Sequence, residues 1–285
     1  MNQPSCPEPK GCGSCSEACA SRPGLPRIKH KIAVLSGKGG VGKSTIAVNL
    51  ACSLASSGRK TGLLDVDLHG PSVPKMLGLQ GAKIEIEAEK MLPVEFGGLK
   101  VMSIGLLTPK TDDPLIWRGP IKANVIRQFL EEVEWGELDY LIVDCPPGTG
   151  DEPLSVIQSL GEGVAAVVVT TPQEVALLDV RKSVNFCRAL NVKILGVVEN
   201  MSGFVCPHCG QLTEIFKTGG GRRLAGEMQI PFLGGIPLDP RAVEAGDEGK
   251  PYIRAFPDSP ASRAVMEIIS KLYADLHPWA KERVK

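Results

Sequence analysis

A glycine-rich segment near the start of the sequence has the residue types and spacing of a phosphate-binding loop, GxxxxGK[ST]. It reads Gly37-Lys38-Gly39-Gly40-Val41-Gly42-Lys43-Ser44 and is followed by Thr45. Glycines let backbone N–H groups turn toward phosphate oxygens, which side chains at these positions would obstruct. In this pattern Lys43 reaches the β- and γ-phosphates and Ser44 binds Mg²⁺. The segment therefore predicts ATP as a ligand.

Three aspartates follow predicted strands and extend this chemistry. Asp65 and Asp67 stand at the end of one strand, and Asp144 ends a later one. Ligands of parallel sheets bind beyond the carboxyl ends of the strands, so all three carboxylates should point toward the phosphate loop. Phosphoryl transfer needs a cation and a polar group that orients water, and carboxylates serve both needs. For Asp65, the alternative is a cap for the following helix.

The nine cysteines form the second group with chemical potential. Four lie in the first 19 residues, two form a CxxC, and three stand singly among apolar residues: Cys6, Cys12, Cys15 and Cys19; Cys206 and Cys209; Cys52, Cys145 and Cys187. Disulfide frameworks are typical of small secreted domains, so this clustering favours metal or redox chemistry. The three single cysteines are expected to be small buried apolar residues, and their positions indicate no function.

The CxxC pair supplies two thiolates, whereas a tetrahedral zinc or a [4Fe–4S] cluster normally takes four ligands. A two-fold dimer would bring Cys206 and Cys209 of both copies together at one site on the axis. On spacing alone, a structural zinc site fits equally well. The N-terminal spacing, C-x5-C-x2-C-x3-C, also allows a cluster, a zinc ion or an unmetallated redox-sensitive tail.

Composition sets the class of protein. The chain has 285 residues, 43% of them hydrophobic, and Lys plus Arg equals Asp plus Glu at 32 each. This balance gives no electrostatic case for nucleic acid or an acidic membrane as the main partner. The N-terminus lacks the basic and apolar regions of a signal peptide, and no apolar run approaches the roughly 18 residues of a membrane span. We expect a cytoplasmic protein.

The elements that must position these residues alternate along the chain. Residues 1–29 are rich in Pro, Gly, Ser and Cys and predict a flexible arm, and residues 30–285 predict one ATPase domain. Expected strands are 32–36, 61–65, 99–104, 139–144, 164–171, 193–199 and 232–237, and expected helices are 43–57, 121–133, 152–160, 174–189 and 261–276. Apolar strands alternating with helices predict an α/β fold, a doubly wound and mostly parallel sheet with helices on both faces. The last helix is expected to pack on the sheet; its alternative is an amphipathic membrane helix.

The early lysine, Lys38, makes the loop resemble the deviant Walker A class, GKGGxGK[ST], of MinD-like ATPases. The chain as a whole resembles the Mrp/ApbC-type P-loop iron–sulfur cluster carriers. The matching segments are Gly37–Thr45, Asp65–Ser72, Trp117–Pro120, Asp139–Asp151, Glu199–Ser202, Cys206–Cys209 and Gly219–Pro240. The resemblance implies a homodimer that binds and slowly hydrolyses ATP and passes a [4Fe–4S] cluster to apo-proteins.

The resemblance also implies roles for single residues. Lys38 would reach across the dimer to the partner's nucleotide, and Asp67 would position the attacking water. Asp144, assisted by Asp65, would hold Mg²⁺ through water beside Ser44. Asn200 would hydrogen-bond adenine and Pro237 would flank its ring. Cys206 and Cys209 would bridge a labile [4Fe–4S] cluster, and Cys6, Cys12, Cys15 and Cys19 would hold a second one. A membrane- or nucleoid-binding spatial organiser, an electron-transferring reductase and a zinc-bound adaptor are the competing functions.

Overall fold

The computed structural model describes residues 27–67, 70–107, 119–206 and 208–276. In this part of the chain, nine strands form one sheet in the order β10-β9-β8-β1-β7-β2-β6-β5, with β11 also paired to β9. The strands are β1 (Ile28–Ser36), β2 (Thr61–Asp65), β5 (Val94–Phe96), β6 (Leu99–Ser103), β7 (Leu138–Asp144), β8 (Val164–Thr170), β9 (Lys193–Val205), β10 (Leu212–Thr213) and β11 (Phe232–Leu238). Only the pairings of β5 and β10 are antiparallel among these described strands. A separate ribbon joins β3 (Ile86–Glu87) to β4 (Lys90–Met91).

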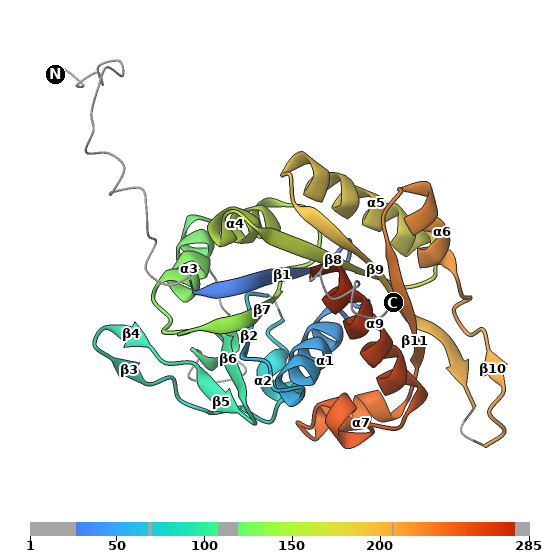
Figure 1. The fold of residues 1–285 in the computed structure, drawn as a ribbon, viewed down its shortest axis with the longest axis horizontal. Coiled ribbons are helices and arrows are strands. Elements are labelled where there is room, and N and C mark those ends of the chain that lie inside the picture. The colour runs from blue at the N-terminus through green and yellow to red at the C-terminus, as the bar shows by residue number, and fades with distance from the viewer. Residues whose placement is uncertain (1–26, 68–69, 108–118, 207, 277–285) are drawn as a thin grey trace, which may run out of the picture.

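Helices cover both faces of the sheet (Figure 1). One face carries α1 (Lys43–Ser56), α2 (Val73–Met76), α7 (Arg241–Asp247), α8 (Tyr252–Ala255) and α9 (Pro260–Leu276). The other carries α3 (Gly119–Glu131), α4 (Asp151–Leu160), α5 (Glu174–Ala189) and α6 (Gly220–Glu227). A short 3₁₀ turn spans Ile104–Leu106. The predicted α/β fold with a mostly parallel sheet is confirmed.

Alternation along the central strand β1 explains the two layers. Ile32 and Val34 enter the core shared with α1 and α9, whereas Ala33 and Leu35 enter the core shared with α3 and α4. Successive side chains of a strand point to opposite faces, so a strand between two helical layers is apolar throughout. The last helix packs as predicted, because Val265, Ile268 and Leu272 of α9 are buried in the α1 core.

Several elements differ from the sequence-based expectations. Strand β1 begins at Ile28 rather than residue 32, because the polar start of the strand is held by partners at the surface. Lys29 Nζ lies 2.8 Å from Asp139 Oδ1, and Lys31 Nζ donates to the carbonyl of Leu160 at 2.6 Å. The short strands β3, β4, β5 and β10 and the helices α2, α6, α7 and α8 were not expected. Among the described helices, none is long and apolar enough to cross a membrane.

Candidate functional site

The glycine-rich loop joins the carboxyl end of β1 to the first turn of α1. Gly40 and Gly42 have φ of 80° and 82°, a left-handed conformation that favours glycine. Gly42 is also the N-terminal cap of α1, so the loop delivers backbone N–H groups at a helix N-terminus. This combination of turned amides and helix dipole suits a phosphate group.

The glycines of the loop meet different surroundings. A Cβ on Gly37 would lie 2.4 Å from the backbone carbonyl carbon of Asp179 in α5, and one on Gly42 would lie 2.2 Å from Asn200 Nδ2. A Cβ on Gly39 or Gly40 would meet nothing within 4 Å. Gly37 is therefore required by packing against the α5 backbone, and Gly42 by its left-handed φ, because the Asn200 side chain could move away from a Cβ. Gly39 and Gly40 leave open the space that a phosphate would enter.

A buried lysine organises the carboxylates beside the loop. Lys43 Nζ lies 2.6 Å from Asp144 Oδ1 and 3.4 Å from Asp67 Oδ2. Asp65 Oδ2 accepts a hydrogen bond from the Ser103 hydroxyl at 2.8 Å, and its Oδ1 accepts from the Asp67 N–H at 3.1 Å. The structure thus brings Lys43 and the three predicted aspartates together at the carboxyl ends of β1, β2 and β7.

Burial shifts the ionisation of this cluster. Burial raises the pKa of Asp65 to about 8, and the nearby Asp144 carboxylate adds to the rise. Burial also raises the pKa of Asp144, although the Lys43 ammonium opposes that rise. Burial disfavours the charged form of Lys43, but Asp144 and Asp67 outweigh this effect and raise its pKa above the ordinary value. Lys43 is therefore cationic, and the carboxylates around it are crowded and poorly hydrated.

Replacing Asp65 with asparagine is expected to stabilise the metal-free, nucleotide-free protein at alkaline pH. The pKa of Asp65 in the folded state, about 8, exceeds its unfolded value, so its contribution to stability is present at low pH and lost as the pH rises toward 8. Denaturant unfolding measures the free energy of unfolding of Asp65→Asn and of wild type at pH 6 and pH 8. The value for the variant minus that for wild type should be larger at pH 8 than at pH 6 by about 1–3 kcal/mol.

Asp139→Asn is the matched control for this measurement. The Lys29 ammonium lowers the pKa of Asp139, so its charged form stabilises the fold, and the control should show no gain at pH 8. A constant difference between Asp65→Asn and wild type across this pH range would contradict the assigned ionisation of Asp65.

Two connected cavities extend from the loop. One, of about 240 Å³, is lined by Lys38, Lys43 and Asp67 among others. The other, of about 390 Å³, lies between α1, α2, α7 and α9 and is lined by Asn200 and Pro237. Gly42, Thr45, Ser72 and Met76 line both, so the two cavities form one continuous groove. Its polar end suits phosphates and its apolar end suits a planar base.

The far end of the groove contains residues that sequence reasoning missed. Asp239 accepts hydrogen bonds from Arg241 Nε at 3.0 Å and from the Tyr252 hydroxyl at 2.5 Å. Tyr252 and Asp239 line the larger cavity, and Arg241 stacks 4.8 Å from the centroid of the Phe256 ring. The Ile236-Pro237-Leu238-Asp239 segment was the available signal, but only the fold brings α8 against it.

The CxxC lies between the end of β9 and the strand β10, which pairs with it antiparallel at one edge of the sheet. Residues 200–218 are called the cysteine hairpin below. The Cys206 N–H donates to the Gln211 carbonyl at 3.0 Å, and the Gly210 N–H donates to the Cys206 carbonyl at 2.8 Å. Cys206 is half-buried and Cys209 is exposed. Backbone N–H groups of Cys209 and His208 lower the pKa of Cys206, which favours the thiolate that a metal binds.

The remaining cysteines divide into two sets. Cys52, Cys145 and Cys187 are buried, as expected, and burial raises the pKa of each thiol. Cys6, Cys12, Cys15 and Cys19 lie outside the described residues, as do Trp117, Arg118, Leu68 and His69. Within the described part of the chain, no group of three or more His, Cys, Asp or Glu side chains is arranged to hold a metal ion.

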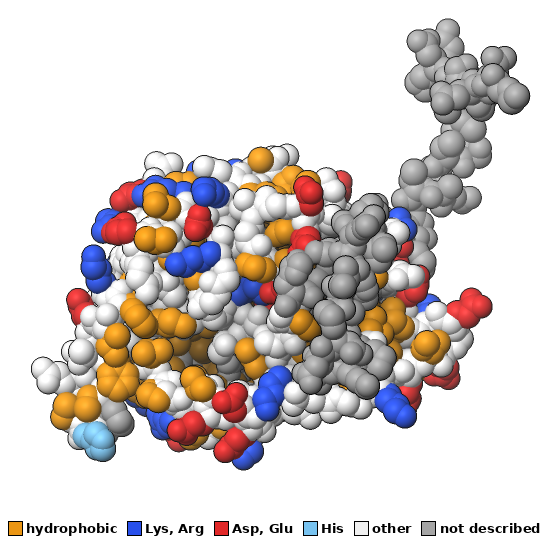
Figure 2. Space-filling view, turned by 180° about the vertical axis from the view of Figure 1, so that it is seen from behind, with side chains coloured by type: hydrophobic (Ala, Val, Ile, Leu, Met, Phe, Trp, Pro, Cys, Tyr) orange, Lys and Arg blue, Asp and Glu red, His pale blue; other side chains and the backbone are white. Residues whose placement is uncertain are grey.

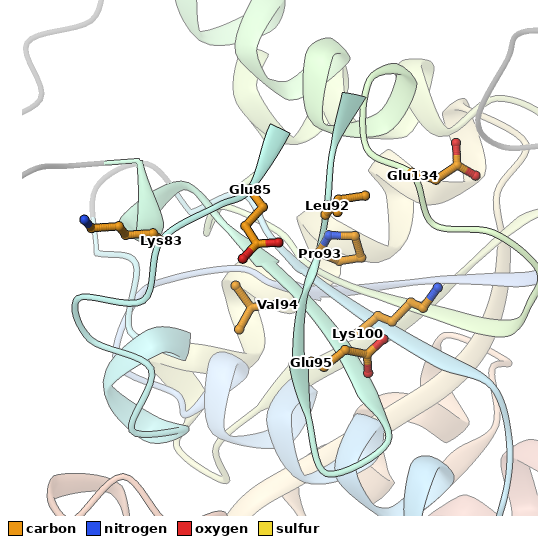
Figure 3. A pocket seen from close by; sticks show the side chains of 8 residues that line it. All are labelled: Lys83, Glu85, Leu92, Pro93, Val94, Glu95, Lys100 and Glu134. Atoms are coloured by element: carbon orange, nitrogen blue, oxygen red, sulfur yellow. The ribbon is translucent and has the colours of Figure 1, made fainter. Parts of the chain in front are cut away.

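A further hollow of about 480 Å³ lies beside β5 and β6 (Figure 3). Its charged lining residues are Lys83, Glu85, Glu95, Lys100 and Glu134. Lys100 Nζ donates to the Trp135 carbonyl at 3.0 Å, and Glu134 pairs with Lys90. Two lysines and three glutamates line this hollow together, so its mixed charges give it no preference for an anion or a cation.

Known proteins resemble this chain over nearly all of the residues that the structure describes. A family model described as NUBPL iron-transfer P-loop NTPase matches residues 27–273. An iron-sulfur cluster carrier protein of Saccharolobus solfataricus is 53% identical over 250 residues, which are 87% of this chain and 84% of the relative. A protein of the same name from Methanocaldococcus jannaschii is 48% identical over 273 residues, 94% of this chain and 93% of the relative.

Solved structures also resemble this chain over most of its length. A nucleotide-binding protein from Archaeoglobus fulgidus in complex with ADP is 42% identical with a TM-score of 0.71, covering 79% of this chain and 88% of that chain. The cell division ATPase MinD of Pyrococcus furiosus is 24% identical with a TM-score of 0.66, covering 86% of this chain and 98% of that chain. At that identity the likeness to MinD shows the fold alone.

Proposed function

Because the chain belongs to the NUBPL-type family of iron-transfer P-loop NTPases, we propose that it carries an iron–sulfur cluster under the control of bound ATP. The proposal has three parts. The chain binds and slowly hydrolyses ATP in the groove beside Lys43. Two copies hold one [4Fe–4S] cluster through Cys206 and Cys209. The dimer then releases this cluster to apo-proteins. The observation that carries the proposal is a single strand, β9, that contains Asn200 of the nucleotide groove and ends at Val205, directly before Cys206.

The nucleotide part is supported by the fit of the groove. Asp144 Oδ2 is buried and has no hydrogen-bond partner among the described residues, so it can accept a bond from a Mg²⁺-bound water. Ser44 follows Lys43 at the start of α1 and would bind the ion directly. Asp65 would assist Asp144 in holding the ion through water. In this arrangement Mg²⁺ offsets the charge of the phosphates.

The residues around the phosphates take separate tasks. Lys43 would exchange its present contacts with Asp144 and Asp67 for the β- and γ-phosphates, which frees Asp67 to orient the attacking water. Backbone N–H groups of residues 37–45 would hold the phosphate oxygens. At the other end, Asn200 would donate to or accept from the adenine edge and Pro237 would lie against the ring. Asn200 Nδ2 now donates to the Val41 carbonyl at 2.9 Å.

A two-fold dimer is supported by exposed apolar side chains near both sites. Val175 and Leu178 of α5 are 66% and 63% exposed, and they precede Asp179, whose backbone packs on Gly37 of the loop. Leu212, Ile215 and Phe216 of the cysteine hairpin are also exposed. Figure 2 shows hydrophobic side chains gathered at the lower left. Because that view is turned by 180° about the vertical axis, this region corresponds to the lower right of Figure 1, where β10 lies. Exposed apolar surface of this kind marks protein interfaces.

The cluster part follows from the ligand count. A [4Fe–4S] cluster takes four thiolates, and each hairpin presents two. Two hairpins meeting on a two-fold axis supply four. A cluster shared between chains is released when the chains separate, which suits a carrier. Cys6, Cys12, Cys15 and Cys19 would hold a second cluster within one chain.

Cluster transfer tests this function directly. The protein is loaded anaerobically and mixed with an apo-enzyme that requires a [4Fe–4S] cluster, in the presence of a strong iron chelator. We expect the recipient to regain activity faster than with equal amounts of free Fe²⁺ and sulfide, because the cluster moves without entering solution. Recovery that the chelator abolishes would contradict the carrier function.

A further inference from the structure

The strand that links the two sites is irregular between them. Asn200 pairs with Ile236 and Phe204 pairs with Leu238. Between these two pairs the chain advances by four residues in β9 and by only two residues in β11. Met201, in this interval, has a φ of 56°, which is unusual for a residue with a side chain. The segment between the nucleotide groove and the cysteines is thus a bulge that the regular ladder of the sheet does not hold.

Glu199, immediately before this bulge, holds both ends of the cysteine hairpin. The residue is buried, with 1% of its surface exposed. One oxygen, Oε1, accepts from the Ser202 hydroxyl at 2.6 Å and from the Gly219 N–H at 2.9 Å, and Oε2 accepts from the Gly221 N–H. Ser202 lies at the start of the hairpin and Gly219 follows its end. A single buried carboxylate therefore joins the two ends of residues 200–218.

The same carboxylate caps a helix. Gly219 is the N-cap of α6, and it has no side chain to bond the free N–H groups. Glu199 supplies the acceptor instead, and its negative charge is favourable at the positive end of the helix. The approach is close: a Cβ on Gly221 would lie 3.1 Å from the Glu199 Cβ, and one on Gly220 would lie 2.4 Å from the Pro172 carbonyl oxygen. These contacts explain the glycines at positions 220 and 221, and Gly219 is explained by its left-handed φ of 78°.

From this arrangement we infer that Glu199 is a positioning residue that couples nucleotide binding at Asn200 to the geometry of the cysteine hairpin. The inference rests on the proposed function, which places a nucleotide beside Asn200. A base that hydrogen-bonds the Asn200 amide displaces it from the Val41 carbonyl and moves the start of the bulge. Because Glu199 ties that start to Gly219 and Gly221, the movement reaches both arms of the hairpin and changes the exposure of Cys206 and Cys209.

Thiol reactivity measures this coupling without any cluster. The parent protein for this test is the full chain in which Cys6, Cys12, Cys15 and Cys19 are replaced by serine. Its reactive thiols are Cys206 and Cys209, because the three single cysteines are 0% exposed. The metal-free protein reacts with an aromatic disulfide reagent with and without saturating ADP. In this parent we expect ADP to change the rate by about fivefold, a typical size for coupling between two sites.

In Glu199→Gln, the rates of thiol reaction with and without ADP should become nearly equal, a ratio close to one, while ADP affinity stays within about twofold. The amide N–H₂ group would face backbone N–H donors, so one end of the hairpin would lose its hydrogen bond. A role confined to stability would raise both rates together and leave the ratio unchanged. Glu227→Gln is the control: it removes the same charge from the exposed end of α6, where Glu227 pairs with Arg181, and should behave as the parent.

The inference is overturned if ADP does not alter the rate in the parent, or if Glu199→Gln keeps the parent ratio. Should Glu199→Gln fail to bind ADP, Ser202→Ala removes one of the three donors and leaves the carboxylate in place. Its ratio should then lie between one and that of the parent, and a ratio equal to that of the parent would overturn the inference. Because these rates are measured without metal, they stand apart from the transfer test of the proposed function.

Discussion

Lys38→Ala is expected to lower the ATP hydrolysis rate by at least about 100-fold and to leave ADP affinity within about threefold. Lys38 is half-exposed and lines the phosphate end of the groove, in contrast to the buried Lys43, which already contacts Asp144 and Asp67. A lysine in this position can reach the nucleotide of a second copy and offset charge that develops only in the transition state. ADP lacks that charge, so its binding should change little.

Steady-state phosphate release and ADP titration measure the two effects. Lys60→Ala is the control, since Lys60 pairs with Glu137 at the surface and does not line the groove. Unchanged hydrolysis in Lys38→Ala would remove Lys38 from the reaction.

Mixing two inactive variants shows whether Lys38 acts across the dimer. In a mixed dimer of Lys38→Ala and Asp67→Ala, one site has an intact Asp67 and receives an intact Lys38 from the other chain. Half of the dimers in an equal mixture are of this kind and each has one working site, so about a quarter of the wild-type rate should return. No recovery on mixing would place Lys38 in its own subunit's site.

The nucleotide half of the site was predictable because its signals are local. The glycine-rich loop is a contiguous motif, and Asp65 and Asp144 end strands whose apolar runs are easily recognised. Parallel strands align their carboxyl ends, so recognising the strands was enough to bring the aspartates near Lys43. The bounds of α5 agree with the prediction because its amphipathic pattern is continuous from Glu174 to Ala189.

Long-range contacts were beyond sequence reasoning. Glu199 carried no predicted role of its own, and nothing in its neighbours indicates that its side chain bonds the start of α6, 20 and 22 positions later. The short strands β3 and β4 have exposed or half-buried residues and no apolar alternation over a useful length. Tyr252 reaches Asp239 only because α8 folds back on the end of β11. These features depend on packing that no single segment specifies.

Replacing both Cys206 and Cys209 with alanine is expected to remove the shared cluster completely, a loss of about one [4Fe–4S] per dimer. ADP affinity should stay unchanged, because neither cysteine lines the groove. Iron and sulfide are counted after anaerobic reconstitution, and Mössbauer spectra identify the cluster type.

The matched control retains Cys206 and Cys209 and replaces Cys6, Cys12, Cys15 and Cys19 with serine. It should keep the shared cluster and lose only iron held by the N-terminal segment. Equal iron in the Cys206→Ala, Cys209→Ala variant and in wild type would show that the hairpin is not the binding site.

Native mass spectrometry of that control, reconstituted without oxygen, tests the shared site most directly. The account predicts a species with the mass of two chains and one [4Fe–4S] cluster, which separates into single chains when the cluster is removed. A single chain that carries its own cluster, or a pair of chains joined by zinc, would contradict it.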